Sequence, residues 1–500
     1  MRKLLSEYSS LLKNLHQIAR KGDCYLIARI QEQKTKFVNI IDDRIETARK
    51  DYIKGIGMRV FTKTGYNAFG SIDNIRNKNE VIKLLKQIIV SAKKAEKLKF
   101  ATNKEIFKLK PSKDIIIPKT EYSFESLKLG QIKKTLININ KKAKEFLPVK
   151  ANSLFNITEE IWRITRSDGT DISFKIPRSI LYCVLTYKKN SQIIQRSART
   201  AGKSYEILLD KQIQQKLIKE IKRITTIMPK LIKVPVYKSG SYDLLLDAGM
   251  AGVLIHEAFG HAAESDHLYQ GSILSKKRKI LKGKKVASSV VSIYDYADEN
   301  DRGFYPYDSQ GVKRKKITIV KKGILREAIS DIYTATKTGA SLTGGSKAEF
   351  YSSIPIPRMS NTILEVEKVL DDKLFSKDLV DISAQDIKNF LVKRGILKGR
   401  KKIIYLQGTM GGQVDILEGT FMLGTNALYE FTKDSVKLFK PASFSGTTLE
   451  ALRSIKFALG RRNSGQLGSC GKAGQIVPVS DSANKFVFIA TDEKIKIGGK

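Results

Sequence analysis

The chain has 500 residues, of which 41% are hydrophobic, and a formal net charge of +41. This composition excludes a mainly disordered protein, because a chain of this length with so many apolar residues buries at least one large core. The three cysteines, Cys24, Cys183 and Cys470, are far apart and odd in number, which excludes a disulfide framework and indicates a reducing, cytoplasmic setting.

The sequence also restricts the partners of the protein. We expect no signal peptide and no membrane association, because the N-terminus lacks an apolar segment and no apolar run reaches the length of a membrane-spanning helix. The positive charge comes mainly from lysines spread along the chain, whereas Arg is the better residue for bidentate contacts with phosphates and bases. We therefore interpret the charge as surface composition, with nucleic-acid binding as the alternative.

The first 231 residues alternate between helical and strand patterns. Apolar stripes predict helices over residues 4–20, 77–98, 125–146 and 208–227. Strands are predicted over residues 24–30, 36–41, 55–61, 68–72, 151–165, 170–175 and 180–187. Pro111 and Pro118 indicate a boundary between these elements. We therefore predict an N-terminal α/β domain over residues 1–112 and a middle α/β domain over residues 119–231.

Beyond Pro235 the pattern changes to short strand-like segments separated by Gly, Asp and Asn. The predicted strands cover residues 286–294, 316–320, 402–407, 414–415, 419–423 and 486–489. This pattern is typical of a β-rich domain that closes on itself. The predicted fold class is therefore α+β, with an N-terminal α/β region followed by a barrel-like C-terminal domain over residues 236–500 that carries the chemistry.

Three of the four histidines lie within a dozen residues, on a short helix for which Asp247 is a suitable N-cap. His256-Glu257 and His261 form a His-Glu-x-x-x-His motif, one residue longer than the zinc-binding His-Glu-x-x-His motif. In a regular α-helix, residues five apart point about 140° away from each other. A shared metal therefore requires either a π-turn near Gly260 or the end of the helix there, with His261 entering from a loop.

Two histidines leave a catalytic zinc site one protein ligand short. On the residues alone, three candidates are open for the third position: His267, Glu264 and Cys470. Cys470 lies in a Gly-rich loop, and its thiolate would be a good zinc ligand, although a free cysteine is more commonly a small buried apolar residue.

At this point the sequence resembles the TldD/PmbA family, once called modulators of DNA gyrase. The motif at residues 256–261 resembles that of TldD proteins, and residues 468–480 are similar to the family's C-terminal Cys-Gly-Lys loop. Further segments match in the expected order, at residues 55–60, 284–288, 355–362 and 411–415. The resemblance implies that His256, His261 and Cys470 hold zinc and that Glu257 activates a water molecule.

The same resemblance implies a function and partners. A zinc metallopeptidase of the active, TldD-like branch is expected to act on short or unfolded peptides, as a homodimer or as a heterodimer with a PmbA/TldE-like paralogue. The alternative is a non-catalytic protein that binds nucleic acid or modulates DNA gyrase.

Four polar residues near the motifs have two interpretations each. Arg358 and Asn361 could position the substrate or stabilise an oxyanion, but a surface salt bridge or cap is the more common role for such residues. Glu264 and Asp266 could orient the ligand histidines, or they could be solvated carboxylates at the end of the helix.

Overall fold

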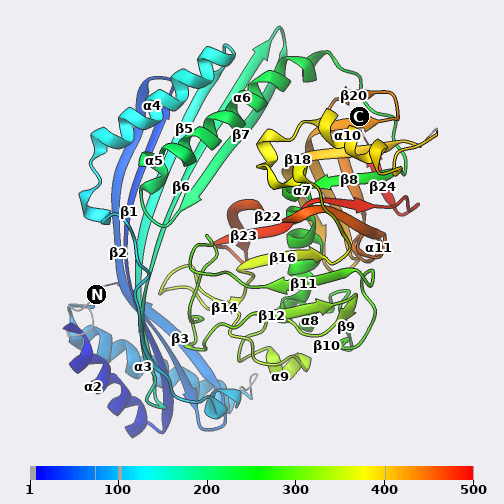
Figure 1. Ribbon diagram of the computed structural model, residues 1–500. Helices are drawn as coiled ribbons and strands as arrows, with labels where there is room; N and C mark the ends of the chain where they lie inside the picture. The colour runs from blue at the N-terminus through cyan, green and yellow to red at the C-terminus, as the bar shows by residue number, and fades with distance from the viewer. Residues whose placement is uncertain (1–6, 74, 100–103, 400, 499–500) are drawn as a thin grey trace.

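The computed structural model describes residues 7–73, 75–99, 104–399 and 401–498 (Figure 1). Within this part of the chain, a long N-terminal sheet packs against a β-rich C-terminal domain. The two units share a core in which Trp162 and Phe174 of the sheet meet Tyr305 and Tyr351 of the C-terminal domain.

The N-terminal sheet contains seven described strands in the order β3-β2-β1-β5-β6-β4, with β7 also paired to β6. Its strands are β1 (Cys24–Ile41), β2 (Arg44–Thr62), β3 (Asn67–Ile72), β4 (Lys113–Ile116), β5 (Lys150–Arg166), β6 (Asp171–Lys189) and β7 (Gln192–Gly202). Strands that were predicted as separate pieces are continuous, since residues 24–41 form one strand and residues 171–189 another. The charged stretch after Asp42 belongs to β2, which pairs with β1 along its length.

This sheet crosses the predicted boundary between residues 112 and 119. β1 pairs with β5 from Ile27 to Ile41, so the first and second predicted domains share one sheet. The segment between the two prolines contains β4, which pairs in parallel with β6. The predicted boundary therefore does not separate two sheets.

Helices cover one face of the N-terminal sheet in two groups. The first group is α2 (Ser9–Lys21) and α3 (Lys78–Lys97), and the second is α4 (Leu129–Phe146), α5 (Glu206–Leu209) and α6 (Lys211–Lys233). The four predicted helices are thus present, although residues 4–6 of the first lie outside the described part of the chain. Alternation along β1 separates the faces: Leu26 and Ala28 face α2 and α3, whereas Ile27 faces the C-terminal domain.

The C-terminal domain is built on a sheet of thirteen described strands. Its main path is β13-β12-β11-β16-β23-β8-β18-β19-β21-β24, with β22 on β23, β17 on β22 and β20 on β19. These strands are β8 (Asp243–Asp247), β11 (Val291–Asp295), β12 (Ile317–Lys321), β13 (Ile324–Leu325), β16 (Asn361–Val366), β17 (Val369–Leu370), β18 (Ile403–Asp415), β19 (Thr420–Phe431), β20 (Val436–Phe439), β21 (Ser443–Thr447), β22 (Ile455–Lys472), β23 (Gln475–Ile489) and β24 (Ile495–Gly498).

The α+β class and the β-rich C-terminal domain are confirmed, but the expected closure of that domain is wrong. Among the described strands the path is open, with β13 and β24 at its ends. The central strands bury both of their faces: Leu244 and Leu246 of β8 lie in one core cluster and Leu245 in another. The sheet is therefore a layer between two apolar cores, and it does not enclose a barrel interior.

The remaining elements are short. They are η1 (Glu105–Lys108), η2 (Phe124–Ser126), α7 (Ala248–Val253), η3 (Leu254–Gly260), η4 (His261–Ala263), α8 (Ser265–Gln270), β9 (Ser275–Lys276), β10 (Lys279–Ile280), α9 (Ala335–Thr338), β14 (Ser346–Lys347), β15 (Ile356–Pro357), η5 (Lys373–Ser376), η6 (Leu379–Asp381), α10 (Ala384–Lys393) and α11 (Thr448–Arg453). Every helix in the described ranges is too short or too polar to cross a membrane.

Candidate metal centre

The histidine motif lies on a buried helix that changes its winding along its length. The Asp247 carboxylate caps the helix by accepting a hydrogen bond from the Met250 backbone N–H at 2.9 Å. The helix continues as α7, becomes a π-helix in η3, and ends as the 3₁₀ turn η4. Of the two alternatives, the structure has the π-turn, and the rings of His256 and His261 lie 5.2 Å apart between centroids.

Gly260 contributes to this helix by allowing close packing. Its backbone φ of −59° is an ordinary helical value, so the residue is not needed for an unusual conformation. A Cβ atom at this position would lie 2.1 Å from the Met359 sulfur, which is far inside van der Waals contact. A larger residue would therefore push Met359 or the helix out of place.

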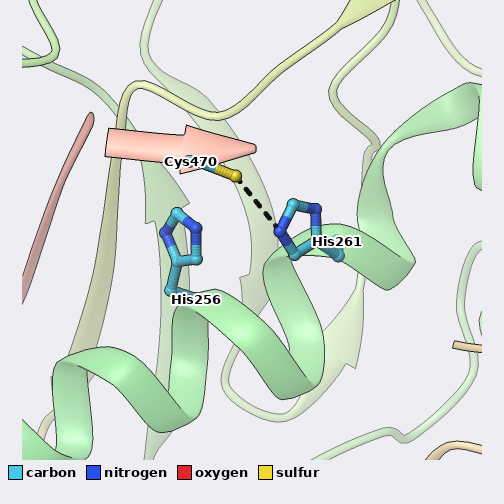
Figure 2. A group of neighbouring side chains, drawn as sticks. All are labelled: His256, His261 and Cys470. Atoms are coloured by element: carbon cyan, nitrogen blue, oxygen red, sulfur yellow. Dashed lines mark hydrogen bonds between the residues drawn. The ribbon is translucent and has the colours of Figure 1, made fainter. Parts of the chain in front are cut away.

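The two histidines meet a cysteine that is distant in the sequence. Cys470 lies on β22, and its Sγ atom is 3.3 Å from Nε2 of His261 (Figure 2). One ligand atom from each of His256, His261 and Cys470 lies within 4.8 Å of the others, and all three residues are buried. These three side chains therefore form a possible metal-binding group.

The electrostatics of the group favour the anionic thiol. Burial would raise the pKa of Cys470, but the facing His256 and His261 lower it to about 6. Burial would lower the pKa of His261, but Glu264 and Cys470 raise it to about 10. The thiolate is the form of cysteine that binds metal, and a metal releases the imidazole proton when it binds.

The chemistry of the three donors tests whether these residues fit a zinc ion. Imidazole nitrogens and a thiolate are the donors that zinc prefers. The donor set therefore fits a zinc ion.

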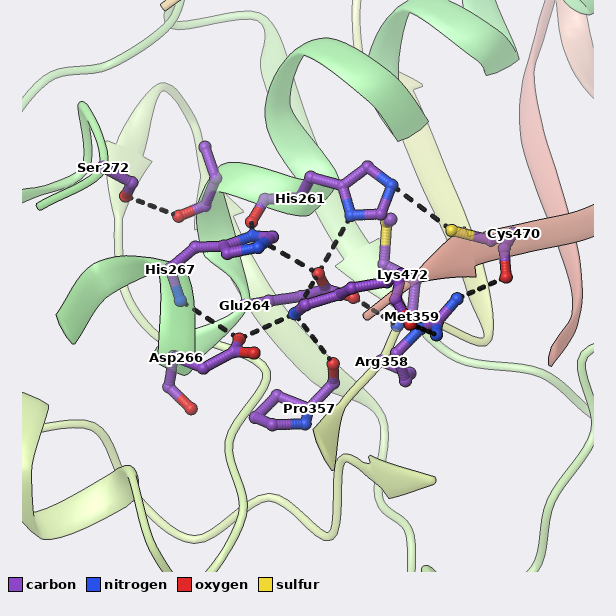
Figure 3. Close-up of polar contacts among 12 residues, drawn as sticks. His261, Glu264, Asp266, His267, Ser272, Pro357, Arg358, Met359, Cys470 and Lys472 are labelled. Atoms are coloured by element: carbon purple, nitrogen blue, oxygen red, sulfur yellow. Dashed lines mark hydrogen bonds and ion pairs between the residues drawn. The ribbon is translucent and has the colours of Figure 1, made fainter. Parts of the chain in front are cut away.

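Glu264 orients His261 through Nδ1, the ring nitrogen that does not face Cys470 (Figure 3). Its Oε2 atom accepts a hydrogen bond from His261 Nδ1 at 2.9 Å, and its Oε1 atom accepts one from the Met359 N–H at 3.1 Å. The Lys472 ammonium donates to Glu264 at 2.8 Å and to Asp266 at 2.7 Å. Burial would raise the pKa of Glu264, but Lys472 and His261 hold it well below its usual value. Of the two carboxylates, Glu264 orients a histidine and Asp266 binds Lys472.

His261, Glu264 and His267 form a second group of possible ligands. The Lys472 ammonium already occupies the Glu264 carboxylate, and Nδ1 of His267 donates to the backbone carbonyl of His261 at 2.7 Å. A cation inside the group opposes a metal, because the two would repel each other. This second group is therefore the poorer candidate.

Arg358 holds the hairpin that carries Cys470. Its side chain is fully buried, so the expected surface role is wrong. The guanidinium donates to the backbone carbonyl oxygens of Cys470, Lys472 and Gln475. Arg358 therefore positions the cysteine, and it does not line the cavity that a substrate would enter.

Asn361 is also buried, and its amide belongs to a structural network. Its Nδ2 atom donates to Asp301 at 3.2 Å, and its Oδ1 atom accepts from the Ser482 hydroxyl at 3.1 Å.

Lys472, which binds Glu264 and Asp266, was not singled out in the sequence as a residue of the site. Its spacing of two from Cys470 in a strand would have placed both side chains on the same face.

A cavity of about 490 Å³ adjoins the group. Both His256 and Glu257 line it, on the wall that the helix forms. The Glu257 side chain is 27% exposed, and its Oε2 atom lies 3.9 Å from Nε2 of His261. Another wall comes from β7 of the N-terminal sheet, so both halves of the molecule line the cavity. Glu257 thus lies between the possible metal ligands and open space.

Known proteins are similar to this chain in sequence. Residues 239–472 match the PmbA/TldA metallopeptidase C-terminal domain family. A Methanocaldococcus jannaschii protein named metalloprotease MJ0996 is 29% identical over 498 residues, which cover 96% of this chain and 99% of that protein. An Archaeoglobus fulgidus protein named metalloprotease is 31% identical over 332 residues, which cover 65% of this chain and 68% of that protein. A Saccharolobus solfataricus protein, 26% identical over 52% of each chain, is named a zinc metalloprotease TldD homolog.

A solved structure has a similar fold. The crystal structure of TldE from Thermococcus kodakarensis matches with a TM-score of 0.73, over 98% of this chain and 100% of that chain. The sequence identity is 16%, so this likeness concerns the fold alone.

Proposed function

Since the chain belongs to the TldD/PmbA metallopeptidase family, we propose that it is a zinc-dependent peptidase that hydrolyses short or unfolded peptides. The observation that carries the proposal is the buried group of His256, His261 and Cys470, with Glu257 beside it on the wall of a cavity. The names of the relatives, one of which specifies zinc, support a metal at this group.

The protein residues have distinct roles in the proposed reaction. Zinc held by the three side chains would act as a Lewis acid and would lower the pKa of a water molecule. A carboxylate oxygen of Glu257 accepts the proton of the attacking water and later delivers it to the leaving amine nitrogen. Glu264 keeps the His261 ring in place through its hydrogen bond to Nδ1.

The shape of the site supports short or unfolded peptides as substrates. The three proposed ligands are at most 8% exposed, and the cavity beside them lies between β7 and the C-terminal domain. A flexible segment of a few residues can enter such a space, whereas the surface of a folded protein cannot. We further propose a cytoplasmic protein that forms a homodimer or pairs with a PmbA/TldE-like paralogue, consistent with its structural similarity to a TldE protein.

The proposed activity is tested by metal removal. Incubation with flexible peptides should give cleavage products by mass spectrometry, a strong chelator should abolish them, and added zinc should restore them. The physical reason is that zinc would polarise the peptide carbonyl, and none of the described side chains that line the cavity is an electrophile of comparable strength. Cleavage that survives complete zinc removal would overturn the mechanism.

The charge of +41 favours nucleic-acid binding as the second candidate function. If the lysines are only surface composition, DNA binding should be weak, indifferent to sequence, and should fall steeply with added salt. Fluorescence anisotropy with two unrelated duplexes over a salt series measures this. Tight, sequence-selective binding at physiological salt would make the nucleic-acid function the preferred one.

A further inference from the structure

Two arginines face the proposed catalytic residues across the cavity. Arg196 and Arg199 lie on β7, which pairs only with β6 among the described strands, so its other edge borders the cavity. The opposite wall carries His256 and Glu257. A peptide bound against these catalytic residues would therefore lie beside the two arginines.

The bonds of these arginines leave their charge unmatched. Arg196 donates to the backbone carbonyl oxygens of Asn426 at 2.7 Å and Gln195 at 2.8 Å, and its Nε atom is buried without a partner among the described residues. Arg199 donates to the carbonyl oxygen of Leu467 at 3.0 Å. Neither guanidinium forms an ion pair with a carboxylate in the described part of the chain. Carbonyl oxygens orient a guanidinium but carry no net charge to balance it.

A nearby arginine provides a contrast. Arg223 lines the adjoining cavity and donates through Nε to Glu220 at 2.8 Å, so its charge is matched within the protein. Glu257 and Asp481 are the acidic residues among those that line the cavity with the two arginines. Asp481 is 4% exposed and lies against Gly252 on the helix, and Glu257 is the proposed proton acceptor.

We infer that Arg196 and Arg199 form a subsite for a substrate carboxylate, so that the enzyme prefers peptides with an acidic side chain or a free C-terminus beside the cleaved bond. The inference rests on the proposed peptidase function and specifies its substrate class. The guanidinium matches a carboxylate in shape and forms charge-assisted hydrogen bonds with it. Protein walls on two sides of the cavity strengthen this attraction relative to open solvent.

Peptide binding tests the subsite without relying on turnover. The ligands are short flexible peptides that contain either Glu or Gln at one internal position, each made as a free acid and as an amide. Their affinity for zinc-loaded Glu257→Gln protein is measured by fluorescence anisotropy. We expect a carboxylate to tighten binding by about tenfold, as one charge-assisted hydrogen bond typically does. The Glu–Gln comparison reports a side-chain carboxylate, and the acid–amide comparison reports the terminal one.

Substitutions then assign the preference to the arginines. Arg199→Gln and Arg196→Gln should each reduce the preference for the carboxylate, and Arg199→Lys should keep part of it because the charge remains. Lys189→Gln removes a positive charge from the exposed end of β6, and it should leave the preference unchanged.

The outcomes separate this inference from the proposed function. Equal affinity for all peptides, or an equal loss of affinity for all of them in Arg199→Gln, would overturn the subsite and leave the arginines as structural links. A carboxylate preference that depends on the arginines, in a protein that cleaves no peptide, would support the subsite and refute the peptidase. Peptide cleavage without any preference for a carboxylate would support the peptidase and refute the subsite.

Discussion

Glutamine in place of Glu257 should leave the zinc content unchanged and lower turnover by about 10²–10⁴-fold, the usual contribution of general acid–base catalysis. The amide has almost the same shape as the carboxylate, but it cannot accept the proton of the attacking water. Glu257 is outside the proposed ligand set, and its Oε2 atom lies 3.9 Å from Nε2 of His261, so the metal group should be preserved. Zinc analysis of the purified variant and peptide cleavage by mass spectrometry measure the two effects.

A matched variant controls for the chemical change itself. Glu365→Gln makes the same replacement at an exposed position on β16, outside the cavity, and it should affect neither zinc nor turnover. Near-normal turnover of Glu257→Gln at full zinc occupancy would remove Glu257 from the role of base. Loss of zinc would instead indicate that Glu257 helps to hold the metal.

The local geometry of the site could be predicted from the sequence. Residues spaced by five cannot share a metal on a regular α-helix, so the motif required a change of winding. The π-helix over residues 254–260 is that change. The Asp247 cap was predictable for the same reason, because both features depend on residues within a few turns of each other.

Features that depend on distant parts of the chain were not predictable in this way. The polar middle of β1 was expected to interrupt the strand, but Gln31 is fully buried and accepts a hydrogen bond from the Tyr351 backbone N–H at 2.8 Å. That contact joins residues separated by 320 positions. The role of Arg358 depends in the same way on carbonyl groups more than a hundred residues later. Sequence periodicity contains no information about such partners.

The structure also shows how near His267 lies to the proposed metal ligands. On an unbroken helix, His267 would lie about 16 Å along the axis from His256. The helix instead ends at Ala263, and α8 brings the His267 ring to 6.0 Å from that of His261. Distance alone therefore does not exclude His267. The contacts of His267 argue against it, because its Nδ1 atom donates to the His261 carbonyl and the neighbouring Glu264 already binds Lys472.

We therefore expect Cys470→Ala to lose both zinc and activity, while His267→Ala keeps both. Loss of a ligand atom should weaken zinc binding by more than the roughly 10–100-fold that loss of an outer hydrogen-bonding partner costs. Cys24→Ala is the matched control, because it makes the same replacement at a buried cysteine in β1 far from the group. The measurement is the zinc stoichiometry of each folded variant after dialysis against a weak chelator, with circular dichroism as the check on folding. Full zinc in Cys470→Ala together with zinc loss in His267→Ala would move the third ligand to His267. The thiol, oriented by Arg358 through the Cys470 carbonyl, would then have a structural role only.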